Sequence, residues 1–162
     1  MAKESKLENL KEDYKKLQLK YSLPSFESLN REFSIEKIAD METELLTKEI
    51  RRFIADKIYN YLRFIETILN PANAPIFIFS IMKSMTQEDK KKLTAIYEKL
   101  SLIDLELIRL DVESSGEKDA EFIKRVFDSW NGIKRELVPI LEKLRYIKDD
   151  EEKDDKSNKY FG

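Results

Sequence analysis

The sequence predicts an all-α protein: an elongated helical bundle of about four long helices with one or two short ones. Only 3 Gly and 4 Pro occur among 162 residues, so the elements should be few and long. Apolar residues recur at spacings of three and four along most of the chain, which is the period of one helix face. Hydrophobic residues make up 41%, enough to bury a core. We expect a single domain over residues 1–148 and a disordered acidic tail over 149–162.

The first expected helix covers residues 3–20. Its apolar residues follow the seam spacing of a coiled coil, and the positions around them are mostly charged, so the apolar stripe is narrow. This N-terminal stripe consists of Leu7, Leu10, Tyr14, Leu17 and Tyr21. Because Pro24 interrupts the helix, the segment can be detached from the bundle, and we expect the stripe to contact a second copy in a dimer. The alternative is that the stripe covers a helix of its own chain.

Two serines mark the starts of the next two expected helices. Ser25 is suited to cap a short helix over residues 26–33, with Ser28 as a competing cap. Ser34 is suited to cap the longest helix of the chain, which we expect over residues 35–69. The apolar spacing in its second half is richer in fours than a heptad, so its two ends should meet different neighbours.

A loop at residues 70–75, with two Pro and two Asn, leads into the most apolar stretch, residues 76–82. Seven residues are too few for periodicity to distinguish helix from strand, and we favour a helix because a lone strand would have no partner. Packing in the core is the default expectation. The alternative is an exposed hook for a partner protein, formed by Ile76, Phe77 and Phe79. The stretch lacks the basic face of membrane-surface helices, so we expect no membrane contact.

Thr86 and Asp89 have the spacing of a capping box at the start of a helix that should reach about Val112. Six apolar residues form its inward stripe: Leu93, Ile96, Leu100, Ile103, Leu107 and Leu110. Four more make the second half apolar on nearly every side: Leu102, Leu105, Ile108 and Val112. Such a helix is buried centrally or at an interface. Partial alternation over residues 103–112 leaves a strand as the minor alternative, and Gly116 should end the element through its permissive backbone.

The last expected helix, residues 118–147, carries the strongest pattern. Eight apolar residues follow spacings of three and four without a miss: Ile123, Val126, Trp130, Ile133, Leu137, Ile140, Leu144 and Ile147. Gly132 and Pro139 interrupt this pattern, and Pro139 should kink the helix or begin a new one.

Composition excludes much of the usual enzyme chemistry. The chain has no Cys and no His, so thiolate nucleophiles, imidazole bases and the common zinc sites are excluded. Glu42, Glu49 and Asp56 recur every seven residues, and we interpret them as a solvated face rather than a metal site. Glu106 and Arg109 have the spacing of a surface ion pair. No Gly-rich phosphate loop occurs. We therefore expect no catalytic residue, no cofactor and no metal, and no enzyme; the alternative is an enzyme that acts through Lys, Tyr or carboxylates.

Charge balance weighs against nucleic acid, because 30 basic residues are interleaved with 32 acidic ones. One basic cluster combines Lys48, Arg51 and Arg52. We predict a non-catalytic protein–protein interaction or scaffolding protein in the cytoplasm; the alternative is a nucleic-acid-associated subunit of a larger assembly. Abundant Lys and Glu without Cys also resembles thermophile usage and predicts an unfolding midpoint above about 60 °C.

Overall fold

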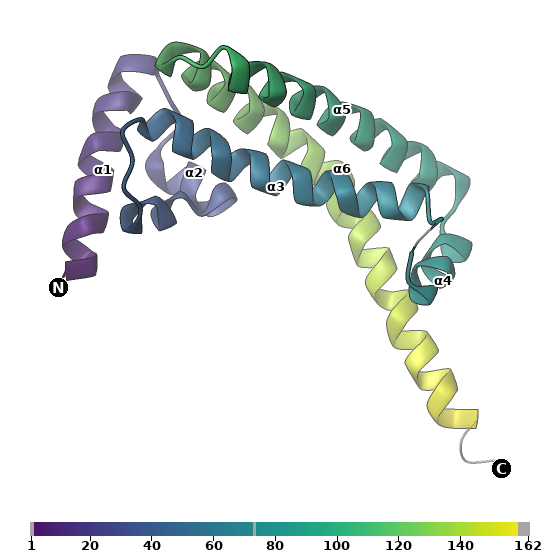
Figure 1. Ribbon diagram of the computed structural model, residues 1–162. Coiled ribbons are helices and arrows are strands. Elements are labelled where there is room, and N and C mark those ends of the chain that lie inside the picture. The colour runs from purple at the N-terminus through teal and green to yellow at the C-terminus, as the bar shows by residue number, and fades with distance from the viewer. Residues whose placement is uncertain (1, 73, 159–162) are drawn as a thin grey trace. The chain divides into compact units, whose positions relative to one another are not determined.

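The computed structural model describes residues 2–72 and 74–158, and the side chains of residues 4–72 and 74–145 (Figure 1). Every regular element in these residues is a helix, which confirms the all-α class. Four long helices and three short ones follow one another: α1 (Ala2–Tyr21), α2 (Phe26–Phe33), the 3₁₀ helix η1 (Ile35–Asp40), α3 (Leu46–Leu69), α4 (Ile76–Ser84), α5 (Gln87–Val112) and α6 (Gly116–Asn158).

The chain forms two compact units, each assembled from two separate stretches. Unit 1 contains residues 1–60 and 102–130, and unit 2 contains residues 61–101 and 131–162. Helices α3, α5 and α6 each contribute residues to both units. The single bundle domain expected over residues 1–148 stays a prediction. Each unit has its own set of buried apolar side chains.

Side-chain caps position the short helices of unit 1. Ser25 caps α2, because its hydroxyl accepts a hydrogen bond of 3.1 Å from the backbone N–H of Ser28. Helix α2 ends at Ser34, which has the left-handed backbone conformation with φ of 55°. The Asn30 side chain accepts a bond from the Glu36 N–H and donates one to the Glu36 carboxylate, both 2.9 Å long. The predicted cap and bounds of α2 are confirmed.

The single long helix expected over residues 35–69 is wrong. The structure replaces it with η1, an irregular stretch and α3, and Ser34 makes no side-chain cap. Met41 is extended, and the Thr43 hydroxyl accepts a bond from the Leu45 N–H just before α3 begins. The physical reason is that residues 41–45 are all exposed, so a continuous helix there would bury nothing. The break lets the two parts of the segment take different directions.

Helix α1 packs against η1 and α2 (Figure 1). Tyr14 anchors this contact: its hydroxyl donates a 2.6 Å hydrogen bond to the Pro24 carbonyl, and its ring meets Phe26 edge-on at 5.5 Å. Burial raises the pKa of Tyr14, and nearby Glu27 raises it further. Other fully buried side chains of unit 1 are Leu29, Ile35, Ile38, Ile50, Ile54, Ile58, Phe122, Ile123, Val126 and Trp130.

In unit 2, the predicted capping box starts α5. The Asp89 N–H donates to the Thr86 hydroxyl at 3.1 Å, and the Thr86 N–H donates to the Asp89 carboxylate at 3.3 Å. Asp89 also holds Lys143 of α6 at 2.8 Å. Pro139 lies inside the continuous helix α6. The described apolar stripes of α5 and α6 face inward as predicted; those in unit 2 are Leu93, Ile96, Leu100, Ile133, Leu137, Ile140 and Leu144.

Both ends of α6 differ from the sequence expectation. Gly116 begins this helix without a positive φ, so the role predicted for its permissive backbone is wrong. A Cβ atom at Gly116 would lie 3.2 Å from the Tyr21 hydroxyl, and this close approach is what the absent side chain permits. At the other end, α6 is helical as far as Asn158, whereas we expected helix only to Ile147. The side chains beyond 145 and residues 159–162 lie outside the described residues, so the disordered tail stays a prediction.

Candidate protein-interaction surfaces

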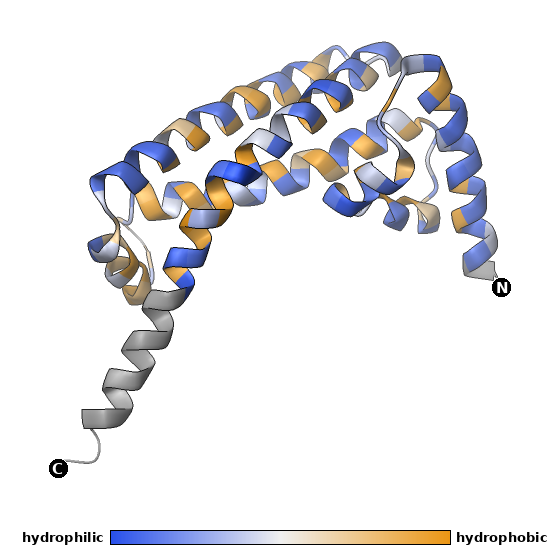
Figure 2. Ribbon diagram, turned by 180° about the vertical axis from the view of Figure 1, so that it is seen from behind, coloured by the Kyte–Doolittle hydropathy of each residue, from blue (hydrophilic) through white to orange (hydrophobic). Residues whose placement is uncertain are grey.

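The α4 surface consists of Ile76, Phe77 and Phe79, which are 87%, 59% and 44% exposed. The helix that we favoured for this segment is confirmed, and Figure 2 shows that most of it is hydrophobic. The default expectation of core packing is wrong for these three side chains, because only Ile78 of α4 is buried. A helix of nine residues has room to bury one face, and here the other face is apolar too. The alternative of an exposed hook agrees with these exposures.

Basic residues outnumber acidic ones in the part of unit 2 up to residue 145, which holds the α4 surface. Residues 61–101 and 131–145 contain ten basic and six acidic residues. Lys83 lies in the last turn of α4 and is exposed. By contrast, Lys92 pairs with Glu88 at 2.7 Å and Lys99 pairs with Glu136 at 2.9 Å. The α4 surface therefore combines three bulky apolar side chains with one exposed cation on the same helix, Lys83.

A second apolar surface, the α5 stripe, lies in unit 1. It consists of Leu102, Leu105, Ile108 and Val112, which are between 58% and 83% exposed. The buried stripe of the same helix includes Ile103, Leu107 and Leu110, so this part of α5 is apolar on both sides. The sequence predicted a helix buried centrally or at an interface, and the structure rules out central burial for these four side chains. They line a groove of ≈ 660 Å³ together with Glu106, Arg109 and Glu113.

The charges beside the α5 stripe are mostly compensated within the chain. Glu106 pairs with Arg125 of α6, and not with Arg109 as the spacing predicted. Glu113 pairs with Lys118 at 3.2 Å, and this ion pair lowers the pKa of Glu113. Arg109 reaches Glu113 only at 3.9 Å, and its side chain is 78% exposed. The guanidinium of Arg109 is thus the loosely held charge of this groove.

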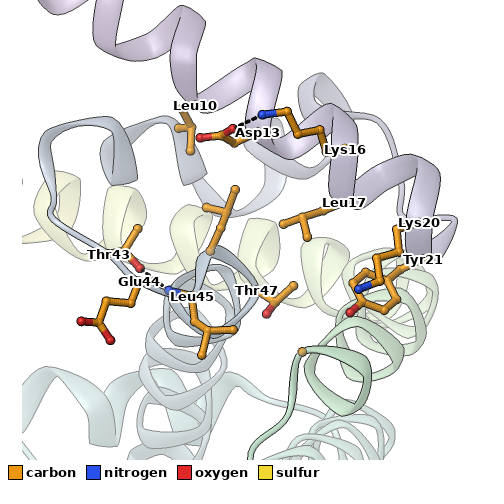
Figure 3. A pocket seen from close by; sticks show the side chains of 12 residues that line it. Leu10, Asp13, Lys16, Leu17, Lys20, Tyr21, Thr43, Glu44, Leu45 and Thr47 are labelled. Carbon is orange, nitrogen blue, oxygen red and sulfur yellow. Dashed lines mark hydrogen bonds and ion pairs between the residues drawn. The ribbon is translucent and has the colours of Figure 1, made fainter.

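The N-terminal stripe lies against its own chain. Leu10 and Tyr14 are buried, and Leu7, Leu17 and Tyr21 are partly covered. This is the alternative that the sequence left open, and it leaves little of the stripe accessible to a second copy. The end of α1 borders a pocket of ≈ 450 Å³ (Figure 3), in which Lys16 pairs with Asp13 at 2.8 Å.

A buried ion pair, missed in the sequence, lies in unit 1. Arg51 of α3 is 2% exposed and Asp119 of α6 is 0% exposed, with Nε and Oδ1 2.9 Å apart. Asp111 accepts a hydrogen bond of 2.7 Å from Arg51 Nη1, and the Ser114 hydroxyl donates to Asp119 at 3.2 Å. Burial raises the pKa of Asp119, while the Arg51 guanidinium opposes this shift. The Thr47 hydroxyl is also buried and has no hydrogen-bond partner among the described residues.

The sequence did contain a signal for this pair. Asp119 lies four residues before Ile123 and extends the α6 stripe backward, and Arg51 lies on the α3 stripe with Ile54 and Ile58. A charged residue in register with a core stripe is the pattern to search for. The basic cluster of Lys48, Arg51 and Arg52 that the sequence indicates therefore includes one buried member, Arg51.

The predicted solvated face of α3 and the preceding loop is correct for Glu42 and Asp56, which are exposed. Glu49 is buried and pairs with Arg52 at 3.1 Å, so the prediction is wrong at that position. In the part of the chain that the structure describes, no three acidic side chains are grouped so that they could share a metal ion.

None of the described helices is both long enough and apolar enough to cross a bilayer. No protein-family model, no curated protein and no solved structure matches this chain.

Proposed function

We propose that this protein is a non-catalytic interaction module that inserts the α4 surface into an apolar cleft of a partner protein. The observation that carries the proposal is the exposure of Ile76, Phe77 and Phe79 on one nine-residue helix. Burying such side chains would contribute about 25 cal/mol of favourable free energy for each Å² of apolar area, and this contribution is absent while they face water. Phenylalanine is also enriched in the buried centres of protein interfaces.

The exposed cation of α4, Lys83, indicates the chemistry of the partner. Lys83 follows the apolar residues on the same helix, and unit 2 carries an excess of basic residues up to residue 145. A partner cleft with an acidic rim would pair with these charges and would speed association. An apolar floor would receive the two phenylalanine rings.

Affinity capture from lysate, with and without nuclease, tests the proposal. We compare the natural chain with Phe77→Asp and with Leu19→Asp, a matched control at an exposed leucine of α1. The proposal expects captured proteins that survive nuclease, persist with Leu19→Asp and are lost with Phe77→Asp. Unchanged thermal unfolding of both variants confirms that the substitutions act on the surface and not on the fold.

Three other outcomes contradict the proposal, and the first two identify its replacement. Loss of the captured proteins on nuclease treatment would favour the nucleic-acid-associated subunit instead. Sedimentation with vesicles of anionic phospholipid, abolished by Phe77→Asp, would assign the α4 surface to a membrane surface. Capture that is identical for all three chains would show that α4 contributes nothing to binding.

A further inference from the structure

We propose that two copies of this chain associate through the α5 stripe, with their α5 helices antiparallel about a two-fold axis beside Leu107 and Ile108. The stripe lies in unit 1 and shares no residue with the α4 surface, so this inference does not depend on the proposed function. It replaces the N-terminal stripe, whose central residues are buried within one chain, as the site of self-association.

The spacing of the α5 stripe fits a helix–helix contact. Residues 102, 105, 108 and 112 follow steps of three, three and four, so they lie along one side of the helix. The buried residues Ile103, Leu107 and Leu110 hold the opposite side against the core of unit 1. The orientation of the exposed side is therefore fixed, and this side can pack along the apolar face of a second helix.

Antiparallel pairing makes the stripe complementary to itself. With the axis beside residues 107 and 108, Leu102 of each copy lies opposite Val112 of the other, and Leu105 lies near Ile108. A two-fold interface uses the same patch on both subunits, which this arrangement satisfies without any further surface. The apolar residues at the two ends of the stripe thus cover each other.

Charge selects the antiparallel direction. Arg109, the loosely held cation of the groove, would face Arg109 of the second copy in a parallel pair, and like charges would repel. The antiparallel pair instead brings Arg109 beside Glu106 of the second copy, a carboxylate that Arg125 of that copy also holds. Two such contacts form, one on each side of the axis, and each places a cation next to a carboxylate.

The apolar area of the α5 stripe determines how tightly we expect the dimer to form. Four side chains with most of their surface exposed supply on the order of a few hundred Å² of apolar area per copy, like the largest patches on monomers. Standard interfaces bury about 800 Å² per partner. We therefore expect a dimer that dissociates at micromolar concentration rather than an obligate one.

The first test is the molar mass measured by light scattering or sedimentation, from about 1 to about 200 µM, a range that brackets micromolar dissociation constants. We expect the mass to rise from 19.3 kDa toward twice that value. The double variant Leu105→Glu/Val112→Glu should remain at 19.3 kDa throughout, whereas Leu19→Glu and Phe77→Asp should behave like the natural chain. A constant monomer mass for the natural chain would overturn the proposal, as would a dimer that survives the double variant.

The second test is disulfide cross-linking, which the absence of cysteine makes unambiguous. A disulfide needs Cα atoms within about 7 Å, and at 1.5 Å per residue an antiparallel pair separates the two copies of residue 102 by about 15 Å. Ile108→Cys should therefore cross-link, Leu102→Cys and Val112→Cys should not, and an equimolar mixture of these last two should. Cross-linking of Leu102→Cys alone would indicate parallel helices and would overturn the antiparallel model.

Arg109 provides a readout that an apolar contact alone would not give. Arg109→Glu should raise the dissociation constant about tenfold by placing like charges at both contacts, and Arg109→Lys should keep it within about threefold. Added salt should weaken the natural dimer and have a smaller or opposite effect on Arg109→Glu. Equal dissociation constants for all three chains would contradict the charge contacts.

Discussion

Arg51 and Asp119 form an ion pair inside unit 1, with 2.9 Å between the guanidinium Nε and the carboxylate Oδ1 and with both side chains buried. The pair joins α3 to the first turn of α6, two elements that are far apart in the sequence. Removing one partner of a buried pair leaves an uncompensated charge, and this is more costly than removing both.

We predict that Asp119→Leu lowers the free energy of unfolding by about 3 kcal/mol, because it removes the whole carboxyl group beside the buried Arg51 guanidinium; the loss is at the lower end for a buried pair because Asp111 still holds Arg51. The double variant Arg51→Met/Asp119→Leu should recover most of this loss. Urea unfolding followed by circular dichroism measures both. Lys16→Met is the control: it removes an ion pair with Asp13 in which both side chains are exposed, and it should cost much less than Asp119→Leu does. A double variant no more stable than Asp119→Leu would contradict the prediction.

The pH dependence of stability should differ in sign at two carboxylates. The ion pair with Lys143 and the bonds with Thr86 lower the pKa of Asp89 below its ordinary value of 3.8. Its stabilisation is therefore present above that value and is lost as pH falls through the lowered pKa. Burial raises the pKa of Asp119, so the folded state gains stability as pH falls through that raised value.

Urea unfolding between pH 2 and pH 7 tests this difference. Asp89→Asn should be less stable than the natural chain at pH 7 and should lose less stability on acidification. Asp119→Asn should lose more stability than the natural chain as pH falls from neutrality, because the gain at Asp119 is absent. Parallel curves for the three chains would show that neither carboxylate has a shifted pKa.

The two described glycines should respond differently to alanine. A Cβ atom at Gly132 would meet nothing within 4 Å, so Gly132→Ala should stabilise the helix by about 0.5–1 kcal/mol. At Gly116 the Cβ would lie 3.2 Å from the Tyr21 hydroxyl, and we expect no net gain. Adding Tyr21→Phe removes that oxygen and should make Gly116→Ala favourable. Thermal unfolding ranks these variants, and equal gains at both glycines would contradict the role of Tyr21.

The single tryptophan reports on the contact between α2 and α6. Its indole N–H donates a 2.9 Å hydrogen bond to the Glu32 carboxylate, and the Lys57 ammonium lies 5.3 Å from its ring. Glu32→Leu removes this acceptor and should cost about 1–3 kcal/mol, whereas Glu32→Gln keeps an acceptor and should cost less. Fluorescence of Trp130 during urea unfolding measures both. Identical midpoints for the two variants would show that the hydrogen bond contributes no stability.

Local sequence patterns were sufficient for much of the secondary structure. The cap at Ser25, the capping box of Thr86 and Asp89, and the inward stripes of α5 and α6 depend on residues within a few positions of one another. Such contacts form inside a single helix, and the spacing of residue types specifies them. The all-α class follows for the same reason.

Tertiary structure decided what the spacing left open. The sequence continued the pattern from Ile35 into α3, yet the chain breaks at residues 41–45, because no neighbouring element covers that stretch. It also showed apolar residues on all sides of α4 and α5 without showing which sides other elements would cover. Arg51 and Asp119 were visible as charges in register with core stripes, but only packing brought α3 and α6 close enough to pair them. Periodicity determines which residues share a face of one helix; the contacts between helices determine which faces remain exposed and where buried charges meet.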